Sequence, residues 1–180
     1  MTTPQTIRFA ETDLDAIAAH EGRVAIIVTP DGKLDPAARR VNRLTKGAVA
    51  RLAASARWGK AKAGDVTTLV MPVGLAAEAL DVLCLPRRPS VDEARRAGVE
   101  LAKVQGGKAL IALMGGTTRI EHLALGLALR AYDFADHRTS EDDKGTAEAV
   151  LMVTRPDEAK TAAAPLLAVA EGVFFTRDLV

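Results

Sequence analysis

One short segment of the chain has the composition of a phosphate-binding loop. It reads Met114-Gly115-Gly116-Thr117-Thr118 and follows an apolar run of strand length. Glycines let a ligand approach the backbone closely, and free amides at a following helix start could hold a phosphate. A tight turn closed by a threonine cap accounts for the same residues and is the simpler interpretation. Both interpretations stay open, and Gly115, Gly116, Thr117 and Thr118 are the candidate cofactor-binding residues.

The residue types that ligate metals or act as nucleophiles are few and scattered. His20, His122 and His137 are far apart, and none lies in a His-Glu-x-x-His pattern. Cys84 has no second cysteine at zinc-ligand spacing, and its apolar surroundings indicate a small buried hydrophobe. His122 is most simply a surface residue, and the acidic run 141–143 is typical of a solvated loop. The sequence therefore predicts no catalytic residue and no metal ligand.

A basic helix face is the one surface at which the sequence suggests nucleic-acid binding. Positive charge attracts phosphates, and aromatic side chains stack on bases. The aromatic contribution here is a single tryptophan, Trp58, so a solvated helix face is the simpler interpretation. The basic residues of this face are Arg39, Arg40, Arg43, Lys46, Arg51, Arg57 and Lys60.

The composition excludes several other classes of protein. The chain has 180 residues, of which 48% are apolar and 26% charged, and this suits one globular domain rather than a disordered chain. The net charge of +1 gives no general attraction to nucleic acid or to an anionic membrane. The first ten residues do not have the layout of a signal peptide, and no apolar run approaches the roughly 20 residues that span a bilayer. We therefore expect a cytoplasmic protein with no membrane partner.

Apolar runs of strand length alternate with helical patterns along the chain, and the glycine loop lies between one such run and a helix. Several runs are almost continuously apolar, which is typical of strands covered by helices on both faces. Residues 66–71 and 80–85 are close enough in sequence to pair antiparallel, whereas the other connections contain helices and favour parallel pairing. The predicted strands are residues 6–9, 24–28, 66–71, 80–85, 108–114 and 148–153.

Two of the helices are predicted to begin at prolines. Asp35 can cap a helix that Pro36 begins, and apolar residues then recur at helical spacing as far as Leu52. Pro156 opens the last helix, in which Pro165 must kink or end the helical register. The residues that follow Gly172 have the pattern of a new amphipathic helix.

Two further helices begin at capping-box patterns. Ser90 pairs with Glu93 and Thr118 with Glu121, and Gly106 ends the first of these helices. The order is strand, helix, strand, helix, two strands, helix, strand, helix, strand, helix. We predict a three-layer α/β domain with a mixed, mostly parallel sheet of about six strands flanked by helices.

Two motifs in the last third of the chain resemble those of one enzyme family. Residues 126–139 (GLALRAYDFADHRT) resemble the G-x-x-L-x-x-Y-x-F-x-x-Y-K-T stretch of leucyl aminopeptidases, with His137-Arg138 where Tyr-Lys is usual. Residues 171–180 (EGVFFTRDLV) resemble the family's E-G-x-x-x-A-R-D-L-V-N-x-P junction helix, with Thr176 in place of alanine. The resemblance implies a macro-domain-like amino-terminal domain at 1–170. Residues 171–180 would then start a linker helix to a missing catalytic peptidase domain.

The same resemblance implies a role for the chain. Family members bind two divalent metal ions, commonly zinc or manganese, in the catalytic domain, and the family's N-T-D-A-E-G-R motif is absent here. This chain would be a non-catalytic domain with no cofactor of its own. It would pack against its own catalytic domain and against sister subunits of a homohexamer. The alternatives are a stand-alone macro-like module that binds ADP-ribose through residues 115–118, and a DNA-binding accessory domain that uses the basic face.

Overall fold

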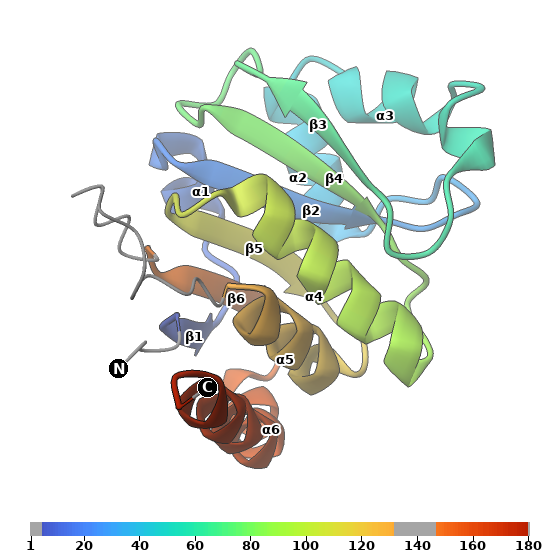
Figure 1. The fold of residues 1–180 in the computed structure, drawn as a ribbon. Helices are drawn as coiled ribbons and strands as arrows, with labels where there is room; N and C mark the ends of the chain where they lie inside the picture. Colours follow the sequence, from blue (N-terminus) through green and yellow to red (C-terminus); the bar gives the residue numbers. More distant parts are fainter. Residues whose placement is uncertain (1–4, 132–146, 180) are drawn as a thin grey trace.

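The computed structural model describes residues 5–131 and 147–179, in which one sheet lies between two layers of helices (Figure 1). The strands are β1 (Ile7–Ala10), β2 (Arg23–Val28), β3 (Val66–Val70), β4 (Ala79–Cys84), β5 (Leu110–Gly115) and β6 (Ala149–Val153). The helices are α1 (Leu14–Ala19), α2 (Pro36–Leu44), α3 (Ala48–Ala53), the short 3₁₀ helix η1 (Trp58–Lys60), α4 (Val91–Gln105), α5 (Ile120–Arg130) and α6 (Pro156–Arg177). The predicted three-layer α/β fold is confirmed.

The sheet has the strand order β1-β6-β5-β2-β4-β3. Every neighbouring pair is parallel except β3 and β4, which form the antiparallel pair expected from their short connection. β2 lies at the centre, because it pairs with β4 on one side and with β5 on the other. The sheet is therefore mixed and mostly parallel, as the sequence predicts.

Two predicted helix starts are present with their capping hydrogen bonds. The Asp35 side chain accepts a hydrogen bond from the amide of Ala38, 2.7 Å away, at the start of α2. Ser90 and Glu93 form a complete capping box at the start of α4. Gly106 ends α4 in the left-handed conformation at φ 57°, which glycine adopts without a steric cost.

Two predictions about helices are wrong in detail. The pattern from Pro36 to Leu52 predicts one helix, but the chain forms α2 and α3 with a turn between them. Lys46 and Gly47 have positive φ angles of 51° and 82°, which no right-handed helix contains. The capping box at Thr118 is also absent, because Arg119 occupies the cap position of α5 at φ 60°.

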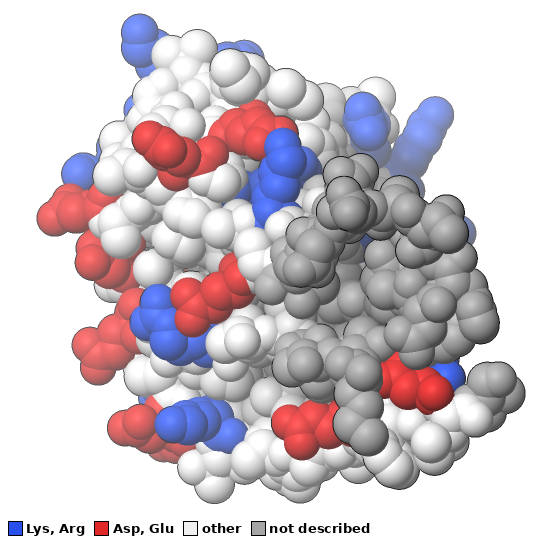
Figure 2. All heavy atoms as spheres, turned by 60° about the vertical axis from the view of Figure 1, so that its left-hand side comes forward, with Lys and Arg blue, Asp and Glu red and all other residues white. Residues whose placement is uncertain are grey.

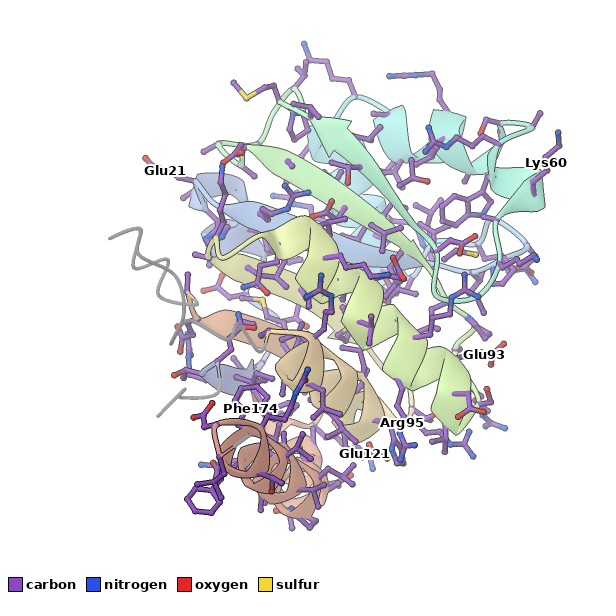
Figure 3. The ribbon with its side chains drawn as sticks, viewed as in Figure 1. Glu21, Lys60, Glu93, Arg95, Glu121 and Phe174 are labelled. Atoms are coloured by element: carbon purple, nitrogen blue, oxygen red, sulfur yellow. The ribbon has the colours of Figure 1, made fainter. Side chains whose placement is uncertain are left out.

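The last helix, α6, continues through Pro165 and through Gly172 as far as Arg177, so it does not end at the proline. Pro165 removes one backbone hydrogen bond from the helix. Residues on both sides of it, Ala163 and Phe174, are buried where α6 packs against α5 and β1 (Figure 3 labels Phe174). This packing holds the two halves of the helix in line.

By length and composition alone, α6 passes as one candidate for a membrane span among the described residues. Its most apolar window of 18 residues has a mean hydropathy of 1.2. A search for continuous apolar runs misses this helix, because Glu171 interrupts its apolar residues and alanines supply much of its hydropathy. Only 17% of the window is buried, so much of this apolar surface faces outward.

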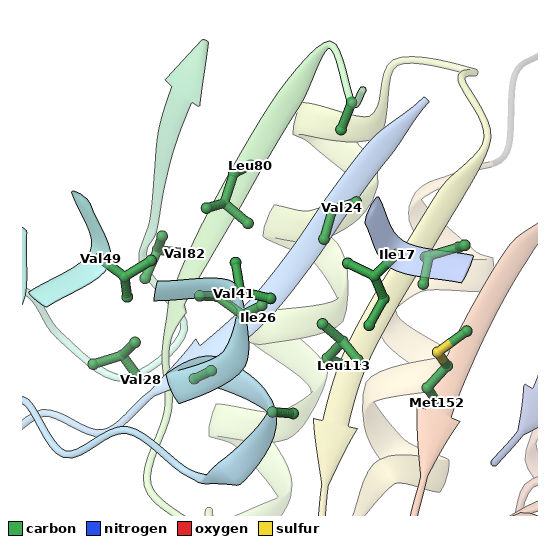
Figure 4. Close-up of a cluster of buried hydrophobic side chains, with 14 of the residues drawn as sticks. Ile17, Val24, Ile26, Val28, Val41, Val49, Leu80, Val82, Leu113 and Met152 are labelled. Carbon is green, nitrogen blue, oxygen red and sulfur yellow. The ribbon is translucent and has the colours of Figure 1, made fainter. Parts of the chain in front are cut away.

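Each face of the sheet has its own hydrophobic core. The first core joins α1, α2 and α3 to one face through side chains such as Ile17, Val41 and Ile26 (Figure 4). The second joins α4 and α5 to the opposite face, where Leu101 and Leu123 are fully buried. Because consecutive residues of a strand point to opposite faces, each central strand contributes to both cores.

Glycines allow α4 and α5 to approach each other closely. A Cβ atom added to Gly98 on α4 would lie 2.0 Å from the carbonyl oxygen of Leu123 on α5. One added to Gly126 on α5 would lie 2.1 Å from the carbonyl oxygen of Arg95 on α4. No side chain fits at either position, so the pair of glycines sets the distance between the two helices.

Candidate ligand cleft

A cleft of about 570 Å³ opens at the carboxyl ends of the parallel strands. It lies between the segments that follow β2 and β5, which are neighbours in the sheet. The chain leaves β2 toward α2 on one face and leaves β5 toward α5 on the other. Ligands of open α/β sheets bind at such a reversal. The lining residues are Thr12, Leu14, Ile27, Thr29, Lys33, Asp35, Pro36, Ala37, Arg87, Gly115, Gly116, Thr117 and Thr154.

The predicted glycine loop forms one wall of this cleft. Gly115, Gly116 and Thr117 line it, whereas Thr118 does not. The amide of Thr117 donates to the carbonyl of Met114 at 3.1 Å, which closes a tight turn. The amide of Thr118 donates to the carbonyl of Arg87 at 3.0 Å. These two amides are therefore committed to the fold and are not available to a ligand.

Gly115 must be a glycine for two independent reasons. Its φ angle is 53°, in the left-handed region that side chains rarely adopt. A Cβ atom at this position would also lie 2.5 Å from a carboxylate oxygen of Asp35. The first glycine thus brings the loop after β5 against the cap residue of α2.

Two side chains from other loops approach Gly116. A Cβ atom at Gly116 would lie 3.3 Å from Nη2 of Arg87 and 3.8 Å from Oγ1 of Thr154. Arg87 follows β4 and Thr154 follows β6, so four segments meet at this point of the sheet edge once Asp35 is included. Sequence analysis missed Arg87, Thr154 and Asp35 as cleft residues, because only the strand order brings them to the glycine loop.

The other basic residue of the cleft is already paired. The ammonium of Lys33 lies 2.7 Å from the carboxylate of Asp31. The hydrogen bond from Lys33, followed by one from Thr29, lowers the pKa of Asp31 from its ordinary 3.8 to about 2. The same contact raises the pKa of Lys33. Arg87 differs from Lys33, since within the described residues no carboxylate forms an ion pair with it.

A buried ion pair lies in the middle of the sheet, away from the cleft. Arg23 on β2 donates to both carboxylate oxygens of Asp81 on β4, at 2.9 and 2.7 Å. Thr68 on β3 donates to the same carboxylate at 2.6 Å. Asp81 is completely buried, and its partners come from adjacent strands. Its fixed contacts and its burial indicate a structural role.

Among the described residues, the other side chains that could ligate a metal or act as nucleophiles do not form a site. Cys84 is fully buried, as predicted, and burial, with a smaller contribution from the charge of Asp65, raises the pKa of its thiol. His122 is half-buried rather than on the surface, and its Nδ1 is buried without a hydrogen-bond partner. His137 and the acidic run 141–143 lie outside the described residues. Within the described ranges, residues 5–131 and 147–179, no group of three or more His, Cys, Asp or Glu side chains is placed to hold a metal ion.

The basic side chains of the predicted face lie on the surface, as predicted, but Trp58 does not. The predicted basic side chains are exposed, and Lys60 projects outward from η1 (Figure 3). Trp58 is buried in the first core, and its indole N–H donates to the carbonyl of Thr29 at 3.2 Å. It therefore cannot stack on a base.

The fold is a three-layer α/β fold similar to that of macrodomains. A Trypanosoma brucei macrodomain in complex with ADP-ribose superposes with a TM-score of 0.60 at 11% identity, over 89% of this chain and 68% of that one. A tomato leucine aminopeptidase mutant gives a TM-score of 0.72 at 18% identity, over 99% of this chain and 39% of that one. These two structures show the fold alone.

Similarity of sequence identifies the family. A probable cytosol aminopeptidase of Dinoroseobacter shibae is 44% identical over 180 residues, and one of Cereibacter sphaeroides is 41% identical over the same length. The chain belongs to the cytosol aminopeptidase family, which confirms the resemblance to leucyl aminopeptidases. It is matched along its whole length but spans only the N-terminal 37% of these relatives. No family model matches it.

Proposed function

We propose that the chain is the non-catalytic N-terminal domain of a cytoplasmic cytosol aminopeptidase. In this proposal, the catalytic part is a two-metal exopeptidase that uses zinc or manganese, and this domain packs against it and contributes to a homohexamer. The match to the N-terminal 37% of the relatives supports this assignment.

The observation that carries the proposal is the outer face of α6. Its large apolar side chains Val169 and Phe175 are 56% and 51% exposed, and Leu179, which follows the end of the helix, is 69% exposed. The other exposed residues of the helix between Thr161 and Phe175 are mostly alanines, with Pro165 and Gly172, and Glu171 is the one charged residue among them. Contiguous exposed apolar surface of this kind marks an interface with another protein surface. The relatives extend well beyond the matched segment, so we assign this face to the catalytic part of the same enzyme.

The test measures association between this chain and the remainder of the Dinoroseobacter shibae relative, expressed as a separate polypeptide. Phe175→Asp and Val169→Asp should each weaken their association about tenfold or more, because burying a carboxylate against an apolar surface is costly. Met71→Asp is the matched control, since Met71 is 73% exposed at the β3–β4 turn, away from α6. Equal weakening by all three variants, or by none of them, would contradict the proposed interface.

Activity provides a second readout of the same proposal. The 180-residue chain alone should not release leucine from leucine amide in the presence of Mn²⁺ or Zn²⁺. Its complex with the remainder of the relative should do so. Turnover that follows the isolated chain through purification would refute the non-catalytic assignment.

A second candidate function is binding of DNA through the basic face. No acidic residue occurs between Pro36 and Gly64, and this segment contains eight lysines and arginines, all exposed. The face of the molecule shown in Figure 2 differs, since there acidic and basic side chains are mixed. A segment with only positive charge attracts a polyanion.

The salt dependence of DNA binding tests this candidate. Replacing Arg40 and Arg43 with Gln should reduce the slope of log K against log salt by about 2, because each phosphate contact contributes about 0.9 to that slope. The same replacement of Arg95 and Arg130, which are exposed on α4 and α5, is the control. No binding at low salt, or an equal effect of both double variants, would reject a DNA-binding face.

A further inference from the structure

The strand β3 is an open edge of the sheet. Among the described strands, β3 lies at one end of the strand order with β4 as its neighbour, and β1 lies at the other end (Figure 1). The register of its pairing with β4 is continuous from Val66 to Val70. Edge strands present unpaired backbone groups to other strands, and proteins commonly shield them with charges, prolines or bulges.

The segment that contains β3 has no charge and is apolar where it is most exposed. No charged residue occurs between Asp65 and Glu78. Within this uncharged segment, Val70, Met71 and Val73 are 73%, 73% and 62% exposed. An uncharged edge that ends in exposed apolar side chains favours pairing with another strand.

The opposite edge of the sheet differs in both respects. β1 has only four residues, and the guanidinium of its Arg8 lies 3.1 Å from the carboxylate of Glu148. Short length and charged side chains on an edge strand disfavour pairing with another strand. A strand that joins this sheet should therefore join at β3 rather than at β1.

The backbone hydrogen bonds of β3 alternate between β4 and the open edge. The amide of Met71, just after the strand, donates to the carbonyl of Glu78 at 2.9 Å. The carbonyl of Asp65, just before the strand, accepts the amide of Cys84 at 2.8 Å. Hydrogen-bonded positions of an antiparallel pair recur at every second residue, so the even-numbered residues of β3 direct their N–H and C=O groups away from β4. These residues are Val66, Thr68 and Val70.

Two copies of β3 match each other when they run antiparallel about a two-fold axis at Thr68. Thr68 then lies opposite its own copy, and Val66 lies opposite Val70 of the second copy. All of these positions have outward N–H and C=O groups, so each pair exchanges two hydrogen bonds. The side chains that meet are threonine with threonine and valine with valine, which are favourable cross-strand neighbours, and no like charges come together.

We propose that β3 pairs with β3 of a second copy of this chain, so that two sheets join into one across a two-fold axis. Closed two-fold pairs are the commonest homo-oligomers, and their surfaces are self-complementary in this way. The proposal rests on the proposed function, because it names the surface at which two subunits of the proposed oligomer meet. α6 packs against β1, at the far edge of the sheet, so the strand interface and the α6 interface can be tested separately.

Sedimentation equilibrium of the 180-residue chain tests the proposal. The chain should form a reversible dimer with twice its mass of 19.0 kDa. Val70→Pro should weaken this dimer about tenfold or more, because one hydrogen bond is lost from each chain. The variant should keep the circular dichroism spectrum of the parent, since proline is tolerated on an edge strand where the N–H faces outward.

Val73→Pro is the matched control and should leave the dimer intact. Val73 is an exposed valine of the same uncharged segment, but it lies beyond the paired residues. It follows Pro72 in a turn in which the amide of Leu75 donates to the carbonyl of Pro72 at 3.3 Å and Gly74 has a φ angle of 83°. A type II turn has this geometry and accepts proline at the position of Val73.

Hydrogen exchange measured by NMR gives a second readout, which depends on the register. As the concentration of the chain rises, exchange should slow at the amides of Val66, Thr68 and Val70. The amides of Thr67 and Leu69 already bond to β4, so their exchange should not follow the concentration in this way.

Each outcome decides the proposal. A dimer that Val70→Pro weakens, and that Val73→Pro and Phe175→Asp leave intact, supports it. A chain that stays monomeric at about 1 mM overturns it, since so weak an affinity is worth only about 4 kcal/mol. Equal losses in the two proline variants, or loss of the dimer in Phe175→Asp, would overturn it as well. The proposed association of α6 with the catalytic part does not depend on these results, because Val70→Pro should leave that association unchanged.

Discussion

The buried ion pair between Arg23 and Asp81 gives the sharpest prediction about stability. Asp81→Ala removes three hydrogen bonds to one carboxylate, two from Arg23 and one from Thr68. It leaves the Arg23 guanidinium, whose side chain is 12% exposed, without its counter-charge. Breaking a buried pair on one side costs about 3–5 kcal/mol. This is a large part of the ~5–15 kcal/mol that stabilises a typical domain, so the unfolding temperature should fall by about 10 °C.

Urea unfolding followed by circular dichroism measures this loss. The paired replacement Arg23→Met with Asp81→Leu should recover most of the stability, because it removes both charges and fills the same space with apolar atoms. Asp92→Ala is the control, since Asp92 is an exposed aspartate in the first turn of α4 and should cost less than about 1 kcal/mol. A loss below about 1 kcal/mol for Asp81→Ala, or a double variant as unstable as the single one, would refute this reasoning.

Three further predictions concern other parts of the fold. Gly98→Ala should destabilise the chain by about 1–3 kcal/mol in urea unfolding, since its Cβ would meet the α5 backbone at 2.0 Å, whereas Gly172→Ala has free space and should stabilise α6 by up to about 1 kcal/mol. The pKa of Asp31 lies below its ordinary 3.8, so its contribution to stability is present above pH 3.8 and is lost as the pH falls toward 2. A carboxyl titration by NMR should show a midpoint near 2 that rises in Lys33→Met, and a midpoint near 3.8 in the parent chain would contradict the pairing. The thiol of Cys84 should react with Ellman's reagent only when the chain is unfolded in urea, and rapid reaction in the native chain would show that it is accessible.

Much of the fold can be predicted because hydrophobic pattern and capping chemistry are local. The central strands are buried on both faces, so they appear as nearly continuous apolar runs, and the short connection between β3 and β4 selects antiparallel pairing. The break at Lys46 and Gly47 was missed because apolar residues keep their helical spacing across it. Arg119 as the cap of α5 was missed for a different reason. Its left-handed conformation is fixed by the tertiary structure, in which its side chain donates to the carbonyl of Pro89.

The candidate cleft was predicted only in part. Gly115 and Gly116 were candidates from the sequence, because glycines between a strand and a helix let a ligand approach the backbone, but a tight turn was the simpler interpretation. Arg87 and Thr154 are not part of any motif in the sequence, and nothing near them indicates that they lie beside the glycine loop. Strand order decides which loops become neighbours, and strand order depends on packing across the whole sheet. The burial of Trp58 has the same origin, since the carbonyl it binds belongs to a loop 29 residues away.

The pairing of β1 with β6 has a consequence for synthesis of the chain. Ile7 lies opposite Ala149, so the first strand finds its partner only after nearly all of the domain has been made. During translation, β2 to β5 can assemble around their helices, while the edge of β5 that later receives β6 stays open. Contacts of such long sequence separation slow folding and expose strand edges to other chains. Nascent chains that stop before residue 149 should therefore be the species of this protein that depends most on chaperones.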